Sequence, residues 1–269
     1  MLIPLLAGLF GLLIGSFLNV CIYRLPRDLS VVRPRSHCTT CERTIAWYDN
    51  VPLLSFVLLG GKCRACGARI AWWYPVVESL TGAAFFLAFW LFPAVAAVKA
   101  SLFAAMSIEL IFSDIEERIL PDEFTIGGTL LGLVLAVALP TRGSLAMFFG
   151  PNAHAWAPSL IEAAAGAGIS SGSLWLVGEI YYRLRGREGI GLGDIKMVAM
   201  IGAFLGIQGV LMTLIFGSVM GSVVGIAYIL LSGESMATYR LPFGTFLGIA
   251  ALAVAFCGGP VLHWPGFWA

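Results

Sequence analysis

Two aspartates are the residues best placed for chemistry, because each stands at the edge of a long apolar segment. Asp114 directly follows the apolar segment 95–113, and Asp194 closes the glycine-rich run 189–194 just before another apolar segment. A carboxylate at the edge of a membrane's hydrocarbon core is energetically costly, so each aspartate is a candidate functional residue. Both are expected at the same membrane depth and on the same side. This arrangement predicts a paired acid–base site.

Two carboxyl groups that lie close together cannot both ionise easily, so they share a proton. One then acts as a base toward water while the other acts as an acid toward the scissile carbonyl, which is aspartic-protease chemistry. This reaction needs no nucleophilic side chain and no metal. On the same face, the sequence offers no Ser/His or Cys/His constellation, and it contains no HExxH motif. The glycine run alone is a weak signal, since glycines also make flexible turns.

The expected position of Asp114 sets a requirement on the rest of the fold. It lies near the C-terminal end of a predicted helix, where the helix dipole disfavours a negative charge. Something else must therefore stabilise this carboxylate. The other acidic residues of the segment 116–123 are interpreted as a solvated loop, with Asp122 in the first turn of the next helix after Pro121.

Four of the six cysteines form two CxxC pairs in the one large polar segment. They are Cys38, Cys41, Cys63 and Cys66. Two such pairs have the spacing of a tetrahedral thiolate zinc site, in which four thiolates leave no open position, so we expect a structural zinc ion. The alternatives are two disulfides or four free thiols, and a reducing cytoplasm disfavours the disulfides. Because four cysteines already fill the site, His37 is not expected as a ligand. Cys21 and Cys257 lie in apolar segments and are expected to be packing residues.

The composition indicates a polytopic membrane protein. Of 269 residues, 59% are hydrophobic and 12% are charged, whereas soluble domains carry about 25% charged residues. A span needs about 20 apolar residues, and the 35-residue uncharged run 197–231 is too long for one crossing, so a break is predicted near 206–209. We predict about eight transmembrane helices, at 3–22, 76–93, 95–113, 124–139, 158–178, 195–207, 209–231 and 240–257.

Positive charge predicts the orientation of these helices. Fourteen of the 16 Lys and Arg residues fall on one side of an eight-span arrangement with both ends outside, and only Lys99 and Arg142 fall opposite. By the positive-inside rule, that side is the cytoplasm. The prediction is an all-α membrane protein with a first transmembrane helix at 1–23 and a small cytoplasmic zinc-binding domain at 24–75. A transmembrane peptidase domain at 76–269 carries both aspartates on the cytoplasmic side.

Several other functions are weighed against this interpretation. A nucleic-acid partner is excluded, because the chain has no basic stripe with interleaved aromatic residues. A membrane transporter is an alternative, since Glu109, Glu162 and Gln208 could line a polar pathway beside glycine-broken helices. It leaves the cysteine segment unexplained, and the chain shows no duplicated half. A non-catalytic pilus or secretion assembly protein with a zinc platform is a further alternative, and it would not depend on either aspartate.

Over nearly its full length, the chain resembles the bacterial type IV prepilin peptidases, also called prepilin leader peptidase/N-methyltransferases, within the GxGD intramembrane aspartic proteases. The resemblance rests on the segments 15–20, 24–26, 48–52, 60–63, 74–78, 120–122 and 191–196, together with the double CxxC and Asp114. By resemblance, Asp114 and Asp194 are the catalytic pair. One departure is Trp73, where relatives often carry a basic residue, and it touches the methyltransferase activity more than the protease.

The resemblance implies two activities. The first removes a basic leader from prepilins and pseudopilins of type IV pilus and type II secretion systems, cutting after a glycine at the cytoplasmic face of the bacterial inner membrane. The second methylates the new N-terminal residue, usually phenylalanine, with S-adenosylmethionine. We find no nucleotide-binding βαβ pattern, and expect Asp49, Lys62 and Glu78 in the methyl-donor site because they lie near the boundary between the polar segment and the membrane. Loop polarity and a helix-start cap are the alternative roles of these three residues.

Overall fold

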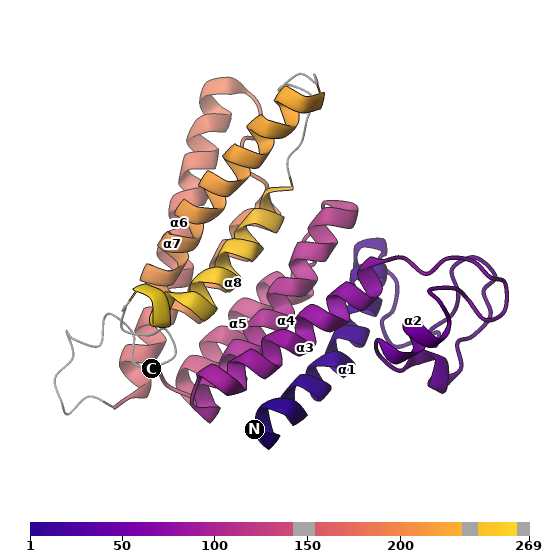
Figure 1. The fold of residues 1–269 in the computed structure, drawn as a ribbon. Helices are drawn as coiled ribbons and strands as arrows, with labels where there is room; N and C mark the ends of the chain where they lie inside the picture. Colours follow the sequence, from indigo (N-terminus) through magenta and orange to yellow (C-terminus); the bar gives the residue numbers. More distant parts are fainter. Residues whose placement is uncertain (142–153, 233–241, 263–269) are drawn as a thin grey trace. The chain divides into compact units, whose positions relative to one another are not determined.

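The computed structural model describes residues 1–141, 154–232 and 242–262, and within these ranges it is helical, with no β-strand. The longer helices are α1 (Leu2–Arg24), α3 (Trp73–Leu91), α4 (Ala94–Glu117), α5 (Asp122–Ala138), α6 (Trp156–Arg185), α7 (Leu192–Ser232) and α8 (Phe243–Leu262) (Figure 1). The segment between α1 and α3 holds the 3-10 turns η1 (Leu25–Arg27) and η2 (Trp47–Asn50) and the short helix α2 (Leu54–Leu58). The chain divides into two compact units, Met1–Phe112 and Ser113–Ala269.

Five helices in the described part of the chain are long and apolar enough to cross a membrane: α1 together with η1, α3, α4, α6 and α7. Helix α8 contributes a shorter apolar stretch, Phe243–Gly258. The predicted break in the long apolar run is confirmed, because Gly206 interrupts α7 with φ 68° and ψ −172°. Arg142 and Arg240, which entered the charge count, lie outside the described residues. The protein is therefore an integral membrane protein with several apolar helices.

In the first unit, small residues let α1 pack closely along α3. A Cβ atom on Gly11 would lie 2.8 Å from the carbonyl oxygen of Thr81, and one on Gly15 would lie 2.7 Å from the Cα of Glu78. On α1 the large residues Leu9 and Leu13 are exposed. Small residues at a helix contact, with large apolar side chains facing outward, are typical of helices surrounded by lipid.

The buried side chain of Arg24 organises the exit from α1. Its guanidinium donates hydrogen bonds of 2.8 Å to the carbonyl oxygens of Ser30 and Pro34. The chain then continues into the cysteine segment, whose backbone forms two isolated antiparallel bridges, His37 with Thr44 and Lys62 with Arg69.

In the second unit, α7 packs against α5, α6 and α8, while α5 also contacts α6. The first half of α7 is the best buried part of this unit: Met197, Val198, Met200 and Ile201 are fully buried. Asp194 lies in the first turn of the same half. The packing of α7 therefore determines where one of the two aspartates stands.

Candidate active site and cysteine cluster

Asp114 lies three residues before the C-terminal end of α4, as the sequence predicted, and its side chain is buried. The requirement for a stabilising partner is met by Thr245, in the first turn of α8. The backbone N–H of Thr245 donates to Asp114 Oδ2 at 2.6 Å, and its hydroxyl donates to the same oxygen at 2.9 Å. The first N–H groups of a helix have no intrahelical acceptor and carry its positive dipole end. The start of α8 thus offsets the unfavourable end of α4.

Asp194 lies at the opposite kind of helix end. It belongs to the first turn of α7, where the helix dipole favours a negative charge. The glycines before it provide room rather than unusual backbone angles, because Gly189, Gly191 and Gly193 are not among the residues with positive φ. A Cβ atom on Gly191 would lie 3.2 Å from Asp194 Oδ2, and one on Gly193 would lie 3.3 Å from the Cβ of Leu120.

The structure brings the two aspartates together. Asp114 lies close enough to Asp194 for its charge to act on that carboxyl group. Leu120, in the segment that follows α4, packs beside Gly193, the residue before Asp194. It also packs beside Gly244, the residue before Thr245. A Cβ atom on Gly244 would also lie 3.1 Å from Asp114 Oδ2. The two carboxyl groups therefore lie in one neighbourhood of the second unit, next to Leu120 and the start of α8.

A surface ion pair connects α7, which carries Asp194, to α5, the helix that follows α4 in the chain. The Nζ of Lys196 lies 2.7 Å from Asp122 Oδ1 and 3.0 Å from Oδ2, joining the first turns of α7 and α5. This position of Asp122 agrees with its interpretation as a helix-start residue. Sequence reasoning missed both this pairing and the role of Thr245. Pro242 is a local signal for a helix start near Thr245, but no sequence pattern links that helix to Asp114.

The two CxxC pairs form knuckles of the same backbone geometry. In each knuckle, the backbone N–H of the first cysteine donates a hydrogen bond to the carbonyl oxygen of the residue five positions later. Cys38 donates to Arg43 at 3.0 Å, and Cys63 donates to Ala68 at 2.8 Å. The carbonyl oxygens of Cys38 and Cys63 in turn accept hydrogen bonds from the backbone N–H groups of Glu42 and Gly67, respectively. Both of these donor residues have positive φ. The two knuckles therefore present their sulfur atoms in equivalent ways.

The four sulfur atoms fit one tetrahedral metal ion. All four Sγ atoms lie within 4.8 Å of one another, and those of Cys38 and Cys66 are 3.8 Å apart. A zinc ion with Zn–S bonds of about 2.3 Å needs S–S separations of about 3.8 Å. A disulfide needs about 2.05 Å, and none of the six cysteines, all of which are described, forms one. The structure therefore shows four free thiols rather than two disulfides, and this donor set suits a thiophilic ion.

The local backbone favours ionisation of one thiol in this cluster. Hydrogen bonds from the backbone N–H groups of Cys41 and Thr40 lower the pKa of Cys38 to about 6. The backbone N–H of Ala68 also favours the thiolate of Cys66, but burial and the neighbouring sulfur atoms outweigh it and raise that pKa to about 11. Four sulfur atoms in one place cannot all ionise readily without a cation between them, so the cluster's electrostatics agree with metal binding.

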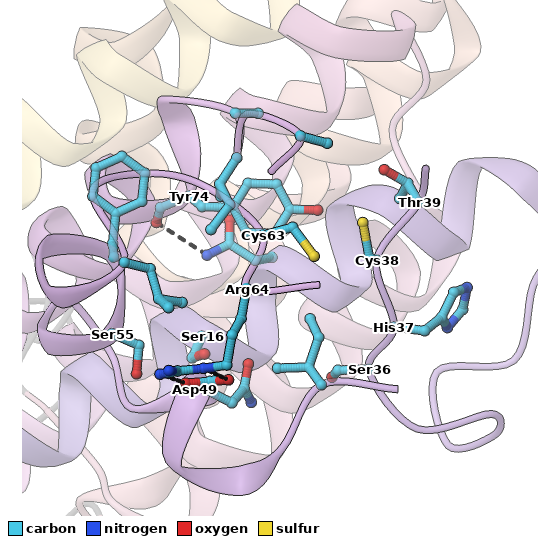
Figure 2. A pocket seen from close by; sticks show the side chains of 18 of the residues that line it. Ser16, Ser36, His37, Cys38, Thr39, Asp49, Ser55, Cys63, Arg64 and Tyr74 are labelled. Carbon is cyan, nitrogen blue, oxygen red and sulfur yellow. Dashed lines mark hydrogen bonds and ion pairs between the residues drawn. The ribbon is translucent and has the colours of Figure 1, made fainter. Parts of the chain in front are cut away.

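A pocket of about 640 Å³ lies in the first unit beside this cluster. Figure 2 shows it between the cysteine segment and the polar side chains of α1 and α3, and its lining includes Asp49, Glu78, Trp73, Cys38 and Cys63. Two of the three residues predicted for the methyl-donor site therefore line one cavity. The third, Lys62, is not among the lining residues. The volume lies within the range of about 300–1,000 Å³ that is usual for small-molecule sites.

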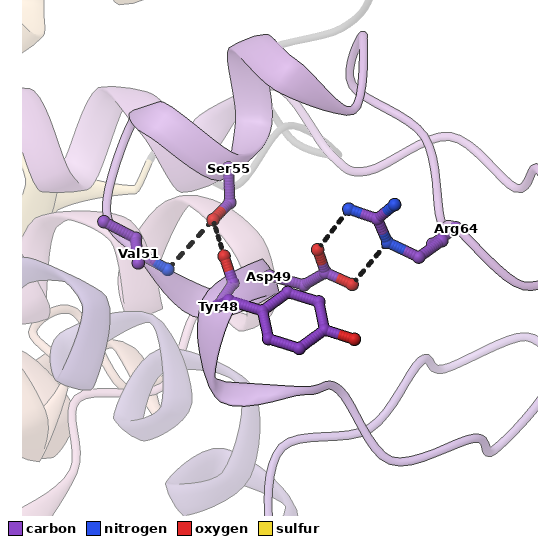
Figure 3. A network of polar contacts seen from close by, with 5 residues as sticks. All are labelled: Tyr48, Asp49, Val51, Ser55 and Arg64. Carbon is purple, nitrogen blue, oxygen red and sulfur yellow. Dashed lines mark hydrogen bonds and ion pairs between the residues drawn. The ribbon is translucent and has the colours of Figure 1, made fainter.

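Asp49 is held by a two-pronged ion pair (Figure 3). Arg64 donates from Nε to Asp49 Oδ2 at 2.8 Å and from Nη2 to Oδ1 at 2.7 Å. The hydrogen bonds from Arg64 hold the pKa of Asp49 below its usual value. Next to this pair, the Ser55 hydroxyl accepts from the N–H of Val51 at 3.0 Å and donates to the carbonyl of Tyr48 at 2.9 Å. The loop that carries Asp49 is therefore fixed on both sides.

Glu78 is buried at the other wall of the pocket and does not cap its own helix. Its Oε2 accepts a 2.8 Å hydrogen bond from the backbone N–H of Leu53, a residue with φ 59°. One turn of α1 lies nearby, where Asn19 donates to the carbonyl of Tyr74 at 3.1 Å. The alternative interpretation of Glu78 as a helix-start cap is replaced by a tertiary role, in which it anchors the loop after Asp49 to α3.

The described part of the chain thus combines two neighbouring carboxyl groups at helix ends with a cluster of four cysteine sulfur atoms. Residues 101–226 match the type IV leader peptidase family, and residues 9–92 match the bacterial peptidase A24 N-terminal domain. The chain belongs to the type IV leader peptidase family.

Several relatives in this family carry the name prepilin leader peptidase/N-methyltransferase. The protein of Myxococcus xanthus is 38% identical over 84% of this chain and 63% of its own length. That of Pseudomonas putida is 32% identical over 95% of this chain and 91% of its own length. The protein of Neisseria gonorrhoeae is 32% identical over 86% of this chain and 84% of its own length. No solved structure matches the chain.

Proposed function

We propose that this protein removes the leader peptide of type IV prepilins and pseudopilins, with Asp114 and Asp194 as the catalytic pair, and then N-methylates the new N-terminal residue. The observation that carries the proteolytic part is the meeting of two carboxyl groups from α4 and α7, one of them held by the start of α8. The names of the relatives support both activities.

The hydrogen bonds to Asp114 bear on how the two carboxyl groups act as acid and base. Both hydrogen bonds from Thr245 go to Oδ2 of Asp114, which leaves Oδ1 for water or substrate. The ionised member of the pair takes a proton from water as the water oxygen attacks the scissile carbonyl, and the protonated member gives its proton to the carbonyl oxygen. The C–N bond then breaks as the carboxyl group that took the proton from water gives it to the leaving amine, while the other carboxylate takes a proton back from a hydroxyl of the tetrahedral intermediate. The start of α8 keeps one carboxyl group in place through these steps.

The orientation of this site follows from charge. We propose about eight spans in the bacterial inner membrane, with both aspartates and the cysteine segment facing the cytoplasm, because 14 of the 16 Lys and Arg residues fall on that side. A substrate with a basic leader and an apolar helix would lie in the membrane with its leader on the same side. Its cleavage point, after a glycine, would then stand level with the two aspartates.

We place the methyl-transfer site in the pocket of the first unit. S-adenosylmethionine supplies the methyl group when bound, and the cavity offers an adequate volume and the acidic side chains of Asp49 and Glu78. The Arg64 pair fixes Asp49, and the Leu53 contact fixes Glu78. A structural zinc ion on Cys38, Cys41, Cys63 and Cys66 would hold the pocket wall that these knuckles form.

Incubation of the purified protein with a prepilin tests the proteolytic function. We expect a size shift equal to the leader with the wild-type protein, and none with Asp114→Asn or Asp194→Asn, although both variants insert into the membrane. An uncleaved prepilin with the wild-type protein would favour a transporter or a non-catalytic assembly protein. Substantial cleavage by either variant would remove that aspartate from the pair.

A further inference from the structure

Glu162 is a buried acidic residue on α6 that the proposed reaction does not use. Its side chain is only 8% exposed, and it lies in a helix long and apolar enough to span a membrane. Acidic residues inside membrane helices are costly and usually have a function. The Oε1 of Glu162 accepts a 3.2 Å hydrogen bond from the backbone N–H of Ile207, the first residue after the break in α7.

The contact around this hydrogen bond is tight. A Cβ atom on Gly206 would lie 2.6 Å from Glu162 Oε1 and 2.7 Å from its Cγ, and the backbone at Gly206 has φ 68°, which favours glycine. One turn away, Gly202 and Gly166 bring the backbones of α7 and α6 into direct contact, with no space for a side chain at either position. The break in α7 is therefore a joint held against α6, with the carboxylate of Glu162 at its centre.

The part of α7 before this joint carries Asp194. It is packed along its length, with four fully buried side chains between Met197 and Ile201. Gly206 lies twelve positions after Asp194, which corresponds to a lever of about 18 Å at 1.5 Å per residue. A tilt of roughly 3° at the joint would therefore move Asp194 by about 1 Å, and a misplacement of that size can lower a reaction rate by about 100-fold.

We propose that Glu162 is a positioning residue for proteolysis: by accepting the Ile207 N–H at the Gly206 break, it holds the α7 segment that presents Asp194 to Asp114. The proposal rests on the proteolytic function proposed above. It requires the acceptor oxygen of Glu162 rather than its charge, because the contact that the structure shows is a hydrogen bond to a backbone N–H. The alternative is that Glu162 only stabilises the helix pair, which would leave turnover by folded protein unchanged.

Kinetics of leader removal by purified protein distinguish a positioning role of Glu162 from a role in helix-pair stability alone. Glu162→Gln keeps an oxygen acceptor at the same distance, whereas Glu162→Met keeps the length and removes the acceptor. Ile161→Ala is the matched control, since Ile161 is the neighbouring residue on α6 and is exposed. We expect Glu162→Met to lower kcat by about tenfold or more with KM within about twofold. The Gln variant and the control should stay close to wild type. Melting temperature reports whether each variant is folded.

Several outcomes would overturn the proposal. Wild-type kcat in folded Glu162→Met would do so, and so would equal losses in the Met and Gln variants, which would point to charge. If the Met variant does not fold, Glu162→Asp replaces it: a lower kcat at unchanged KM supports positioning, and an unchanged kcat rejects it. If the Asp variant also fails to fold, Glu162 is a folding residue and the proposal is rejected. A wild-type protein that does not cleave would instead refute the proteolytic function itself.

Discussion

Thr245 donates two hydrogen bonds to one oxygen of Asp114, although the two residues lie 131 positions apart in the sequence. The contact joins the C-terminal end of α4 to the first turn of α8. It explains how a carboxylate is kept at a helix end whose dipole disfavours it, because the unpaired N–H groups of a second helix supply the compensation. The hydroxyl adds a donor that can be removed by mutation without touching the backbone.

We predict that Thr245→Val lowers kcat for leader removal by about tenfold, because one of the two hydrogen bonds to the carboxyl group is lost. The backbone N–H remains, so activity should not disappear. Thr245→Ser keeps the hydroxyl and should stay within about threefold of wild type. Kinetics on a synthetic prepilin peptide measure both variants. Equal activity in the Val and Ser variants would show that the hydroxyl is dispensable.

The ion pair between Lys196 and Asp122 should matter little. The two side chains are 37% and 57% exposed, and exposed pairs contribute about 0–1 kcal/mol because water and salt screen them. Asp122→Asn is therefore expected to reduce leader removal by less than about fivefold, in contrast to complete loss with Asp194→Asn. Rates compared at low and high salt provide the check. A loss of cleavage as severe as that of Asp194→Asn would assign Asp122 a catalytic role.

The cysteine cluster should bind about one zinc ion per chain. We predict that metal analysis of purified protein finds one equivalent, and that it is lost when Cys38, Cys41, Cys63 and Cys66 are replaced by serine. Cys21→Ser and Cys257→Ser are matched controls that should keep the metal, because neither cysteine belongs to the cluster of four. Chelation should loosen the polar segment, which limited proteolysis can detect. A metal-free preparation with full activity would argue against a structural role.

Methyl transfer should depend on the pocket more than leader removal does. We expect Asp49→Asn and Glu78→Gln to raise the share of cleaved but unmethylated pilin, which mass spectrometry of pilin N-termini measures. Lys62→Ala should have a smaller effect, because Lys62 does not line the pocket. Were no variant to change the methylated fraction, the cofactor site would lie elsewhere, with the loops nearer the aspartates as the next candidates. A parallel fall of cleavage and methylation would indicate one shared site.

The Asp49–Arg64 pair also predicts a pH response for the pocket. Because Arg64 lowers the pKa of Asp49 in the folded protein, the pair's contribution is fully present above the usual aspartate pKa of about 4 and is lost as pH falls through the lower folded value. Asp49 should therefore stay ionised between pH 5 and 8, roughly the range used for activity assays. Titration of Asp49 followed by NMR checks this, and a midpoint above the usual pKa would contradict the pairing.

Local sequence patterns were sufficient to predict several structural features of this protein. The length of the apolar run 197–231 required a break, which occurs at Gly206. The spacing of the CxxC pairs predicted two similar knuckles, because each knuckle is closed by hydrogen bonds within a few residues. The position of Asp114 near a helix end followed from the end of an apolar segment. Such features depend on neighbouring residues, so periodicity and spacing are sufficient to find them.

Only the tertiary structure decided which groups complete the site. The Thr245 contact to Asp114 and the Glu162 contact to Ile207 join residues 131 and 45 positions apart. Both depend on how closely helices pack, which follows from glycine-lined contacts between particular pairs rather than from any helix alone. That Lys62 does not line the pocket also became clear only in the tertiary structure, because the sequence shows it merely as a charge near Asp49 and Glu78.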